Sequence, residues 1–531
     1  MSKAGPKPPI RSLLVHPVCF ALLPVLVLYT GNLGDVHLGD LWLPAVLALA
    51  AGAAVWWVCT RVTRARPRGA VLASLFWLWF FAYGQWQRWL APEDALAETV
   101  CPILYGVVLV VIVGLLVATR RDLKHPSGAL NLIALVLVAL QVLTIGRHEV
   151  KRLRYRPGPP AERVEARAAA AGEVRPHLYF IVLDGYARAD VLADLYRYDN
   201  QPFLDFLHSR GFQIARDSRA NYCQTQLSLG SCLNLDYLEA LADPEHPRDR
   251  LRVPQLLAEN RVFAFLREQG YAIVPFASGY YATEMPGVEV RRPPRRIGEL
   301  SEFQTALVSA TPLLLLLRSR LGRSLDADHV RGEMMLYTFS HLASVARSPR
   351  PSFIFAHIVC PHPPFIFRRD GSMVGPLKSV GLEDGVEFRG TQEEYVNGYR
   401  EQVEFVNRRV ETLVDEILVA AERPTAIVLI SDHGPGSRLD WHHLDKVDLR
   451  ERFATLVAIR LPEGKTAKLN DHISTVNVLR FVLSQCLGAE LPPLPSRSYF
   501  SDWRDPLNLT LVTDEQGRFR RFAASPARKA R

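Results

Sequence analysis

Apolar residues are spread unevenly along the chain, and this unevenness divides it into two parts. The first 150 residues hold five apolar stretches, each close to the roughly 17–25 residues that span a bilayer. Helices of a soluble bundle keep a polar face toward water, and these stretches have almost none. The pattern therefore predicts five transmembrane helices, at about Leu13–Leu28, Leu41–Thr60, Ala70–Trp89, Val100–Thr119 and Ala129–Ile145.

The charges between those stretches predict how the helices are oriented. Lys and Arg gather before the first stretch, between the second and third, and between the fourth and fifth. The positive-inside rule then makes the N-terminus cytoplasmic, and five crossings leave everything after Ile145 outside. The basic cluster at Arg147–Arg156 runs against this orientation, but long domains translocate largely regardless of charge. We expect a multi-pass protein of the inner (cytoplasmic) membrane, with its larger domain on the periplasmic or extracytoplasmic side.

After residue 176 the pattern changes to short apolar runs that alternate with helical periodicity. This alternation predicts an α/β fold with a largely parallel central sheet and helices on both faces. The apolar run Ala306–Leu317 is too short to span a bilayer, and it is either a buried helix, which we favour, or a helix on the membrane surface. Strands are predicted at Leu178–Leu183, Ala272–Phe276, Phe353–Ile358, Ala426–Ile430 and Leu456–Arg460, and helices at Phe203–His208, Pro254–Arg267, Gln392–Ala420 and Ile473–Leu487.

Together these patterns divide the chain into four segments. They are a transmembrane domain at 1–147, a linker at 148–176, an α/β domain at 177–505 and a basic tail at 506–531. The net charge of +9 owes much to the membrane flanks and the tail. No zinc finger, RNA-recognition pattern or basic-aromatic stripe accompanies it. We therefore expect membrane lipids, and no nucleic acid, as partners.

Residues of metal-ligand type follow several of the predicted strands. Asp184 ends the first strand, and Asp432 and His433 follow a later one. Carboxylates and imidazole at neighbouring strand ends can hold a divalent cation. Thr225 is predicted to begin a helix, where its hydroxyl can cap the helix or, activated by a cation, act as a nucleophile. His362 follows another strand and can bind a second metal or a substrate oxyanion.

This ordered set of motifs resembles a known family. It comprises Asp184, Thr225 with Ser228 three residues on, the loop His362-Pro363-Pro364-Phe365 and the segment Ser431-Asp432-His433-Gly434, behind five membrane stretches. The arrangement resembles the sulfatase-like branch of the alkaline phosphatase superfamily. In layout it is similar to the membrane-anchored lipoteichoic acid synthases and lipid A phosphoethanolamine transferases.

The resemblance implies a specific metal site and nucleophile. One Zn²⁺ or Mn²⁺, or at most two such cations, would be held by Asp184, Thr225, Asp432 and His433, with Thr225 as the nucleophile. Substrate contacts are expected from His362, which matches a substrate-binding histidine of the family, and from Asn221, Ser228 and His443.

Two cysteine features bear on the same comparison. The transferases carry a disulfide beside the nucleophile, which Cys223 and Cys232 resemble, and the two residues can pair in an oxidising compartment. Arylsulfatases need a Cys-x-Pro-x-Arg motif, which this sequence lacks, so we expect phosphate rather than sulfate chemistry. The predicted function is a membrane-anchored, metal-dependent transferase or hydrolase acting on phospholipid or phosphorylated glycan head groups. The alternative is a catalytically silent membrane scaffold with the same fold.

Overall fold

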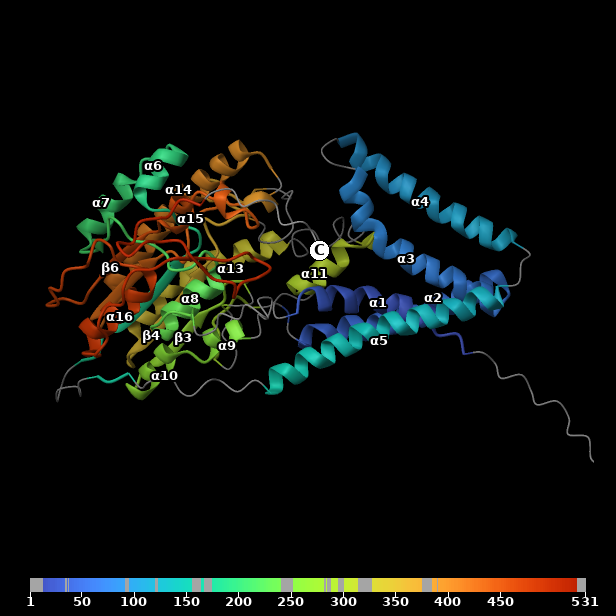
Figure 1. Ribbon diagram of the computed structural model, residues 1–531, viewed down its shortest axis with the longest axis horizontal. Coiled ribbons are helices and arrows are strands. Elements are labelled where there is room, and N and C mark those ends of the chain that lie inside the picture. The colour runs from blue at the N-terminus through green and yellow to red at the C-terminus, as the bar shows by residue number, and fades with distance from the viewer. Residues whose placement is uncertain are drawn as a thin grey trace, which may run out of the picture. The chain divides into compact units, whose positions relative to one another are not determined.

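The computed structural model describes residues 13–33, 36, 38–90, 95–119, 123–154, 164–166, 174–239, 252–280, 283, 288–294, 300–313, 327–374, 384–388 and 390–522. The chain forms two compact units. The helical unit comprises Met1–Arg156 with Arg296–Ala327, and the α/β unit comprises Pro157–Arg295 with Asp328–Arg531. The secondary structure of each unit is shown in Figure 1.

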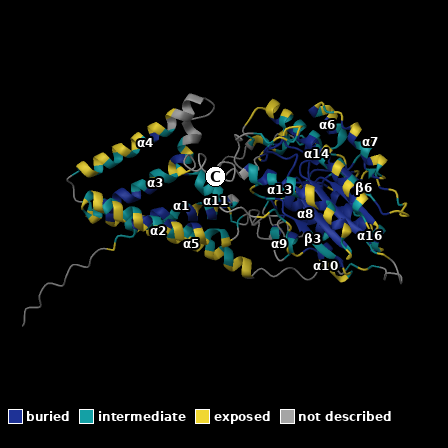
Figure 2. Ribbon diagram, turned by 180° about the vertical axis from the view of Figure 1, so that it is seen from behind, coloured by how far each residue is buried: buried dark blue, intermediate teal, exposed yellow. Residues whose placement is uncertain are grey.

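The helical unit contains a long helix at each of the five predicted apolar stretches. Many large apolar side chains on these helices are exposed, which is the reverse of a soluble bundle and is visible as yellow and teal along α2, α4 and α5 in Figure 2. The helices are α1 (His16–Gly31), α2 (Leu38–Thr63), α3 (Arg66–Leu90), α4 (Ala95–Ala118) and α5 (Lys124–Arg154).

Two of these helices are long and apolar enough to cross a membrane, namely α2 and the part of α5 at Lys124–Leu153. Helix α1 and the Pro102–Ala118 part of α4 are shorter apolar helices. The presence of five helices agrees with the sequence pattern, whereas five membrane crossings stay a prediction.

The apolar run after residue 300 behaves differently from the expected buried helix. Helix α11 (Glu302–Ser309) begins with a capping box of Ser301 and Gln304 and is only eight residues long. It belongs to the helical unit, where Phe303 packs edge-on against Tyr29 with ring centroids 6.1 Å apart. Residues 314–317 of the predicted run lie outside the described residues.

The α/β unit is built on a six-stranded sheet in the order β2-β6-β5-β1-β4-β3. All five predicted strands are present, and short β2 was not predicted. Strands β5, β1, β4 and β3 are parallel to one another, and every residue of β1, β4 and β5 is buried. The strands are β1 (His177–Leu183), β2 (Gln213–Ile214), β3 (Ala272–Phe276), β4 (Ser352–Ile358), β5 (Thr425–Ile430) and β6 (Val457–Arg460).

One edge of the sheet corrects the prediction of a largely parallel arrangement. Strand β6 pairs antiparallel with β5, and β2 pairs antiparallel with β6, so the sheet is mixed. The connection between β5 and β6 contains only the five-residue helix α15 (Leu449–Phe453) as an α-helix. A strand parallel to β5 would need a crossover connection that carries the chain back to the other end of the sheet. The connection after β5 instead enters β6 at the end of the sheet where β5 finishes, so β6 runs antiparallel.

Helices cover both faces of the sheet, as predicted. Successive residues of β1 point to opposite faces, so Tyr179 and Ile181 join one core cluster and Phe180 and Val182 the other. The first face is covered by α6 (Ala189–Tyr196), α7 (Gln201–Ser209), α13 (Ala327–His341) and α14 (Gln392–Ala420), and the second by α8 (Thr225–Asn234), α10 (Arg261–Glu268) and α16 (Thr475–Leu487).

The segment boundaries differ from the predicted ranges at two further places. Helix α5 continues to Arg154, beyond the predicted end of the membrane domain at 147. Residues 506–522 are part of the α/β unit, because β7 (Tyr499–Phe500) pairs with β8 (Thr510–Leu511) and Val512 is fully buried.

The predicted helix Pro254–Arg267 is two helices, α9 (Arg252–Ala258) and α10, because Asn260 ends one and caps the next. Its side chain donates to Leu257 O and accepts from Phe263 N at 2.8 Å.

We predict that Asn260→Ala lowers the midpoint of thermal unfolding of the full-length chain in detergent, since such a cap contributes about 1 kcal/mol. Asn260→Ser keeps an acceptor oxygen and should recover most of the loss. An unchanged midpoint in the Ala variant would contradict the capping role.

Candidate metal centre

Three parallel strands bring the predicted site residues to one edge of the sheet. Asp184 directly follows β1, and Asp432 and His433 follow its neighbour β5. His362 follows β4, the neighbour of β1 on the other side. Because parallel strands end at the same edge, residues far apart in the chain meet there.

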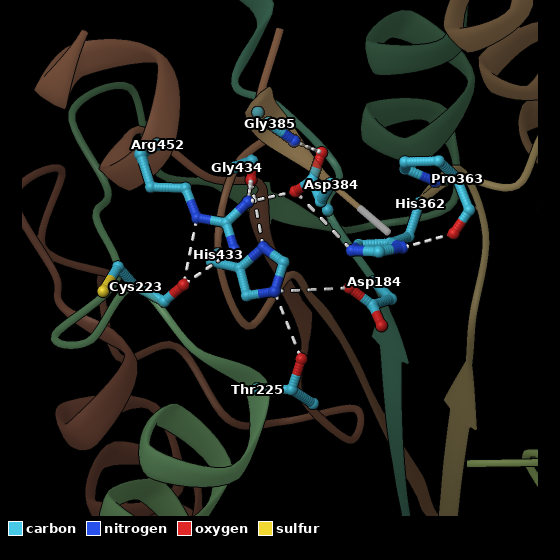
Figure 3. Close-up of polar contacts among 12 residues, drawn as sticks. Asp184, Cys223, Thr225, His362, Pro363, Asp384, Gly385, His433, Gly434 and Arg452 are labelled. Carbon is cyan, nitrogen blue, oxygen red and sulfur yellow. Dashed lines mark hydrogen bonds and ion pairs between the residues drawn. The ribbon is translucent and has the colours of Figure 1, made fainter. Parts of the chain in front are cut away.

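Three side-chain oxygens lie near one imidazole nitrogen at this edge, and Figure 3 draws two of these contacts, from His433 to Thr225 and to Asp184. Thr225 Oγ1 lies 3.1 Å from His433 Nε2. Asp432 Oδ2 lies 3.4 Å and Asp184 Oδ1 lies 3.5 Å from the same nitrogen. In a tetrahedral zinc site with bonds of about 2.0–2.1 Å, neighbouring ligand atoms are about 3.3 Å apart. The three distances from His433 Nε2 are therefore close to those between neighbouring ligands of one cation.

The two carboxylates have one unpaired oxygen each, and both oxygens face this point. Asp184 Oδ1 and Asp432 Oδ2 are buried and have no hydrogen-bond donor among the described residues. A buried carboxylate oxygen without a partner is costly unless a cation compensates its charge. With an imidazole and a hydroxyl completing the set, the residues fit a divalent cation such as Zn²⁺ or Mn²⁺.

The protonation of His433 suits a metal ligand. Its Nδ1 lies 3.0 Å from the carbonyl oxygen of Gly434, which can only accept, so Nδ1 carries the proton. The lone pair of Nε2 is then directed at the cluster. Burial and the nearby Arg452 guanidinium both lower the pKa of His433, which keeps the ring neutral.

The pKa of Asp184 reflects competing effects. Burial alone would raise it, but the histidine rings around the carboxylate outweigh burial and hold the pKa below its usual range. The largest of these contributions comes from His362, followed by His357 and His433. The carboxylate is therefore ionised, as a metal ligand must be.

Thr225 is the first residue of helix α8, as the sequence predicted for a hydroxyl at a helix start. The free N–H groups of a first helical turn and the helix dipole favour an anion there. Ser228, one turn on, donates to the backbone oxygen of Asp432 at 2.6 Å. Ser228 thus ties the helix of Thr225 to the strand end of the ligand pair.

Helix α14 braces two of the loops that form the site. Tyr399 donates to Gly185 O and accepts from Ala187 N, which fixes the turn after Asp184. Gln402 donates to the backbone oxygens of Pro361 and His362 and accepts from two amides further along the same loop. His362 Nδ1 donates to Pro363 O, so its Nε2 is left to face Asp384 Oδ2 at 3.6 Å.

A buried arginine, which the sequence reasoning missed, joins three segments behind the site. Arg452 donates to Asp384 Oδ2 at 2.7 Å, to Gly434 O at 3.0 Å and twice to Cys223 O. Arg452 sits in a short, charged stretch that resembles an exposed helix, and Asp384 lies in a loop without a recognisable motif. No sequence signal distinguishes either residue.

Gly434 is required by the same close packing. A Cβ atom at this position would lie 1.9 Å from Glu451 O, so a larger residue would force α15 away from the strand end. Its amide also donates to Arg452 O at 2.7 Å. The glycine after the Asp-His pair thus allows α15, and with it Arg452, to approach the ligands.

His357, which the sequence reasoning weighed and disfavoured, also contacts the site. Its Nε2 lies 3.1 Å from Asp184 Oδ2, and its Nδ1 lies 3.0 Å from Thr283 Oγ1. This ring therefore holds the ligand oxygen opposite the one that faces the cluster. His357, His362 and His433 thus all lie near Asp184, and this grouping is visible only in the fold.

Two residues that were predicted to contact substrate form hydrogen bonds or ion pairs with other residues of the protein. His443 is half exposed and bonds to Asp440. Asn221 is fully buried, and its side chain is bonded to Thr475, Val476 and backbone further on, which favours a positioning role. Their contact with substrate stays a prediction.

The structure answers the question that the sequence left open about the two cysteines, which form no disulfide. Cys223 and Cys232 are both free, and they belong to different core clusters. Cys223 precedes helix α8, whereas Cys232 lies near its end. Seven residues of helix separate Thr225 from Cys232, a rise of about 10 Å at 1.5 Å per residue, which exceeds the Cα separation of a disulfide.

Comparison with known proteins gives distant structural similarities. No family model and no curated protein matches the chain. Among solved structures, the integral membrane protein lipooligosaccharide phosphoethanolamine transferase A from Neisseria meningitidis is 13% identical, with 89% of this chain and 95% of that chain covered and a TM-score of 0.40. The periplasmic domain of EcEptC from Escherichia coli in complex with Zn is 12% identical, with coverages of 68% and 97% and a TM-score of 0.42.

A putative sulfatase from Bacteroides thetaiotaomicron is 16% identical, with coverages of 63% and 75% and a TM-score of 0.37. Phosphoethanolamine transferases and sulfatases are thus among the solved proteins to which the chain shows distant similarity. Similarity at this level assigns no activity, and the functional argument rests on the geometry of the site.

The first prediction for this site concerns metal content. Asp432→Asn removes a negative ligand with little change in shape, and we expect the purified full-length protein to lose at least about 90% of its bound Zn²⁺ or Mn²⁺ by elemental analysis. Asp370→Asn, which neutralises an exposed carboxylate, serves as the matched control. Equal metal content in the two variants would remove Asp432 from the ligand set.

The second prediction for this site concerns the buried ion pair between Arg452 and Asp384. Arg452→Met leaves Asp384 buried without its cation, and we expect a loss of about 3–5 kcal/mol in the free energy of unfolding. Adding Asp384→Asn should restore most of it, because the uncompensated charge is then gone. Arg438→Met breaks an exposed pair with Asp448 and should cost less than about 1 kcal/mol. A double variant no more stable than Arg452→Met would show that the charge pairing is not what matters.

Proposed function

We propose that this protein is a membrane-anchored, metal-dependent transferase or hydrolase of phosphoesters, of the sulfatase-like branch of the alkaline phosphatase superfamily. One observation carries the proposal above the others. The Thr225 hydroxyl, at the start of a helix, lies 3.1 Å from His433 Nε2. Two buried carboxylate oxygens without hydrogen-bond donors, one from Asp184 and one from Asp432, lie near the same nitrogen. A scaffold would have no reason to keep two such oxygens unpaired.

The site residues have distinct roles in the proposed reaction. Asp184, Thr225, Asp432 and His433 would hold one divalent cation, which supplies positive charge that lowers the pKa of a bound hydroxyl and neutralises phosphate oxygens. The Thr225 oxygen attacks phosphorus in line with the leaving group. The Thr225 Oγ–P bond forms as the bond from phosphorus to the lipid or glycan oxygen breaks, and the hydroxyl proton leaves to solvent or to the departing oxygen.

The substrate's remaining oxygens meet donors that the fold already positions. The N–H groups of the first turn of α8 would face an anion bound at Thr225, and His362 would offer its Nε2 to a non-bridging oxygen. A water, lipid or glycan hydroxyl then takes the group from Thr225, which completes hydrolysis or transfer. Because His362 also lies with Asp184 and His433 in a group of ligand atoms within 4.8 Å of one another, it is the residue through which a second cation would bind.

The membrane helices favour a substrate that is itself in the membrane. We place the N-terminus in the cytoplasm and the α/β unit on the periplasmic or extracytoplasmic side of the inner membrane, following the distribution of Lys and Arg between the apolar stretches. A catalytic unit tethered by apolar helices stays near lipid-linked head groups, which supports a phospholipid or phosphorylated glycan as substrate.

The nucleophile assignment can be tested with purified full-length protein and phospholipids labelled in the head group. We expect Thr225→Ala to lower the rate of head-group release by at least about a thousandfold, because removing a nucleophile removes the covalent route. Thr225→Ser should keep measurable turnover and a covalent head-group phosphate on the peptide that contains residue 225. Thr412→Ala, on the exposed side of α14, is the control. Undiminished turnover in Thr225→Ala would end the assignment.

A further inference from the structure

A cavity of about 210 Å³ in the α/β unit is lined by four arginines. None of its lining residues belongs to the metal centre or contacts the atoms assigned to the cation. The arginines come from segments far apart in the chain: the loop after β1, the stretch before α8, helix α15 and the C-terminal segment. They are Arg188, Arg219, Arg450 and Arg518, and we refer to the cavity as the arginine pocket.

Three of the four guanidinium groups have carboxylate partners. Arg188 and Arg450 form ion pairs beside the pocket, and Arg518 forms one within the C-terminal segment. The closest distances are 2.6 Å from Arg188 to Asp190, 2.6 Å from Arg450 to Asp194 and 2.9 Å from Arg518 to Asp514. These three arginines are therefore oriented by their carboxylates before any ligand arrives.

Arg219 is the exception, since no ion pair joins it to a carboxylate in the described part of the chain. Its Nε is buried and has no acceptor among the described residues. Its guanidinium lies over the ring of Phe519 at 5.8 Å. Burial first, and then the neighbouring Arg188, lower the pKa of Arg219, and the opposing charges of Asp217 and Asp514 do not offset them. A negative ligand among the guanidinium groups would offset the repulsion between Arg219 and Arg188.

Asp217 is the acidic residue that lines the pocket, and its carboxylate already has partners. Asp217 Oδ1 lies 3.7 Å from Arg188 NH1, and Asp217 Oδ2 lies 3.5 Å from His472 Nδ1. Both oxygens thus face cationic or hydrogen-bonding groups. Among the four arginines of the pocket, Arg219 is therefore the one without an ion pair to a carboxylate in the described part of the chain.

We propose that the arginine pocket binds a phosphate group, with Arg219 as its principal donor. Planar guanidinium groups match phosphate oxygens in pairs, and a tetrahedral anion can accept from several arginines at once. The cavity is smaller than the roughly 300–1,000 Å³ of sites for drug-sized ligands, so it takes a phosphate group and not a whole lipid. Arg518 is largely exposed at 76% and Arg450 at 42%, which leaves the rim open for a chain attached to the phosphate.

This inference does not depend on the proposed function, because it concerns binding at residues outside the metal centre. The phosphate can belong to a lipid head group or to a soluble molecule. Both sources present the same anion to Arg219, and they differ only in what extends past the rim.

The test measures phosphate binding by full-length protein in neutral detergent, with chelator and in an Asp432→Asn background, so that the metal centre does not contribute. We expect inorganic phosphate to bind and to raise the unfolding midpoint. Arg219→Gln in this background should weaken binding at least tenfold. Arg216→Gln, which removes an exposed arginine three residues away, should leave binding unchanged.

Arg518→Gln provides a second variant at an exposed position, where misfolding is not a concern, and it should weaken binding severalfold. A parallel titration uses phosphatidic acid in the same micelles. Tighter Arg219-dependent binding of this lipid than of inorganic phosphate identifies a lipid head group as the source, and equal or weaker binding identifies a soluble phosphate. The proposal is overturned if the Asp432→Asn protein binds neither ligand, or if the Arg219 and Arg518 variants bind both as tightly as Arg216→Gln.

Discussion

The constraint on which the site depends is the burial of two carboxylate oxygens that face one imidazole nitrogen and have no donor of their own. Like charges held this closely in a buried place repel, and they persist only where the surrounding fold holds them and a cation can join them. The parallel pairing of β5, β1 and β4 sets this arrangement, because it fixes where the strands end. Three histidines around Asp184 then favour its ionised form.

The rest of the α/β unit serves to keep those strand ends in place. Helix α14 crosses one face and holds two site loops through Tyr399 and Gln402. Helix α8 lies against the other face, with Thr225 at its start and Ser228 bonded to the backbone of Asp432. The nucleophile and the ligands are thus positioned from opposite faces of the sheet, which gives a rigid site without a disulfide.

Sequence patterns predicted the strands, the long helices and the core of the ligand set, because those features follow from local periodicity and from polar residues at strand ends. Asp384, Arg452 and His357 were not predicted as site residues, since their roles arise from contacts between distant segments. The strand β6 was predicted, but its antiparallel direction was not, because an apolar run looks the same in either direction. The sequence left the pairing of Cys223 and Cys232 open, because a separation of nine residues does not show that a helix lies between them.

Arg452 has a consequence for how the protein matures. Its guanidinium joins backbone or side chains that are 229, 68 and 18 residues away along the chain, and loop closures of that length are slow relative to local folding. Arg452 can join the segment before Thr225 to Gly434 only after residue 452 has been synthesised. A chain cut short before α15 would therefore contain Asp184, Thr225, Asp432 and His433 and still lack the side chain that holds their segments together.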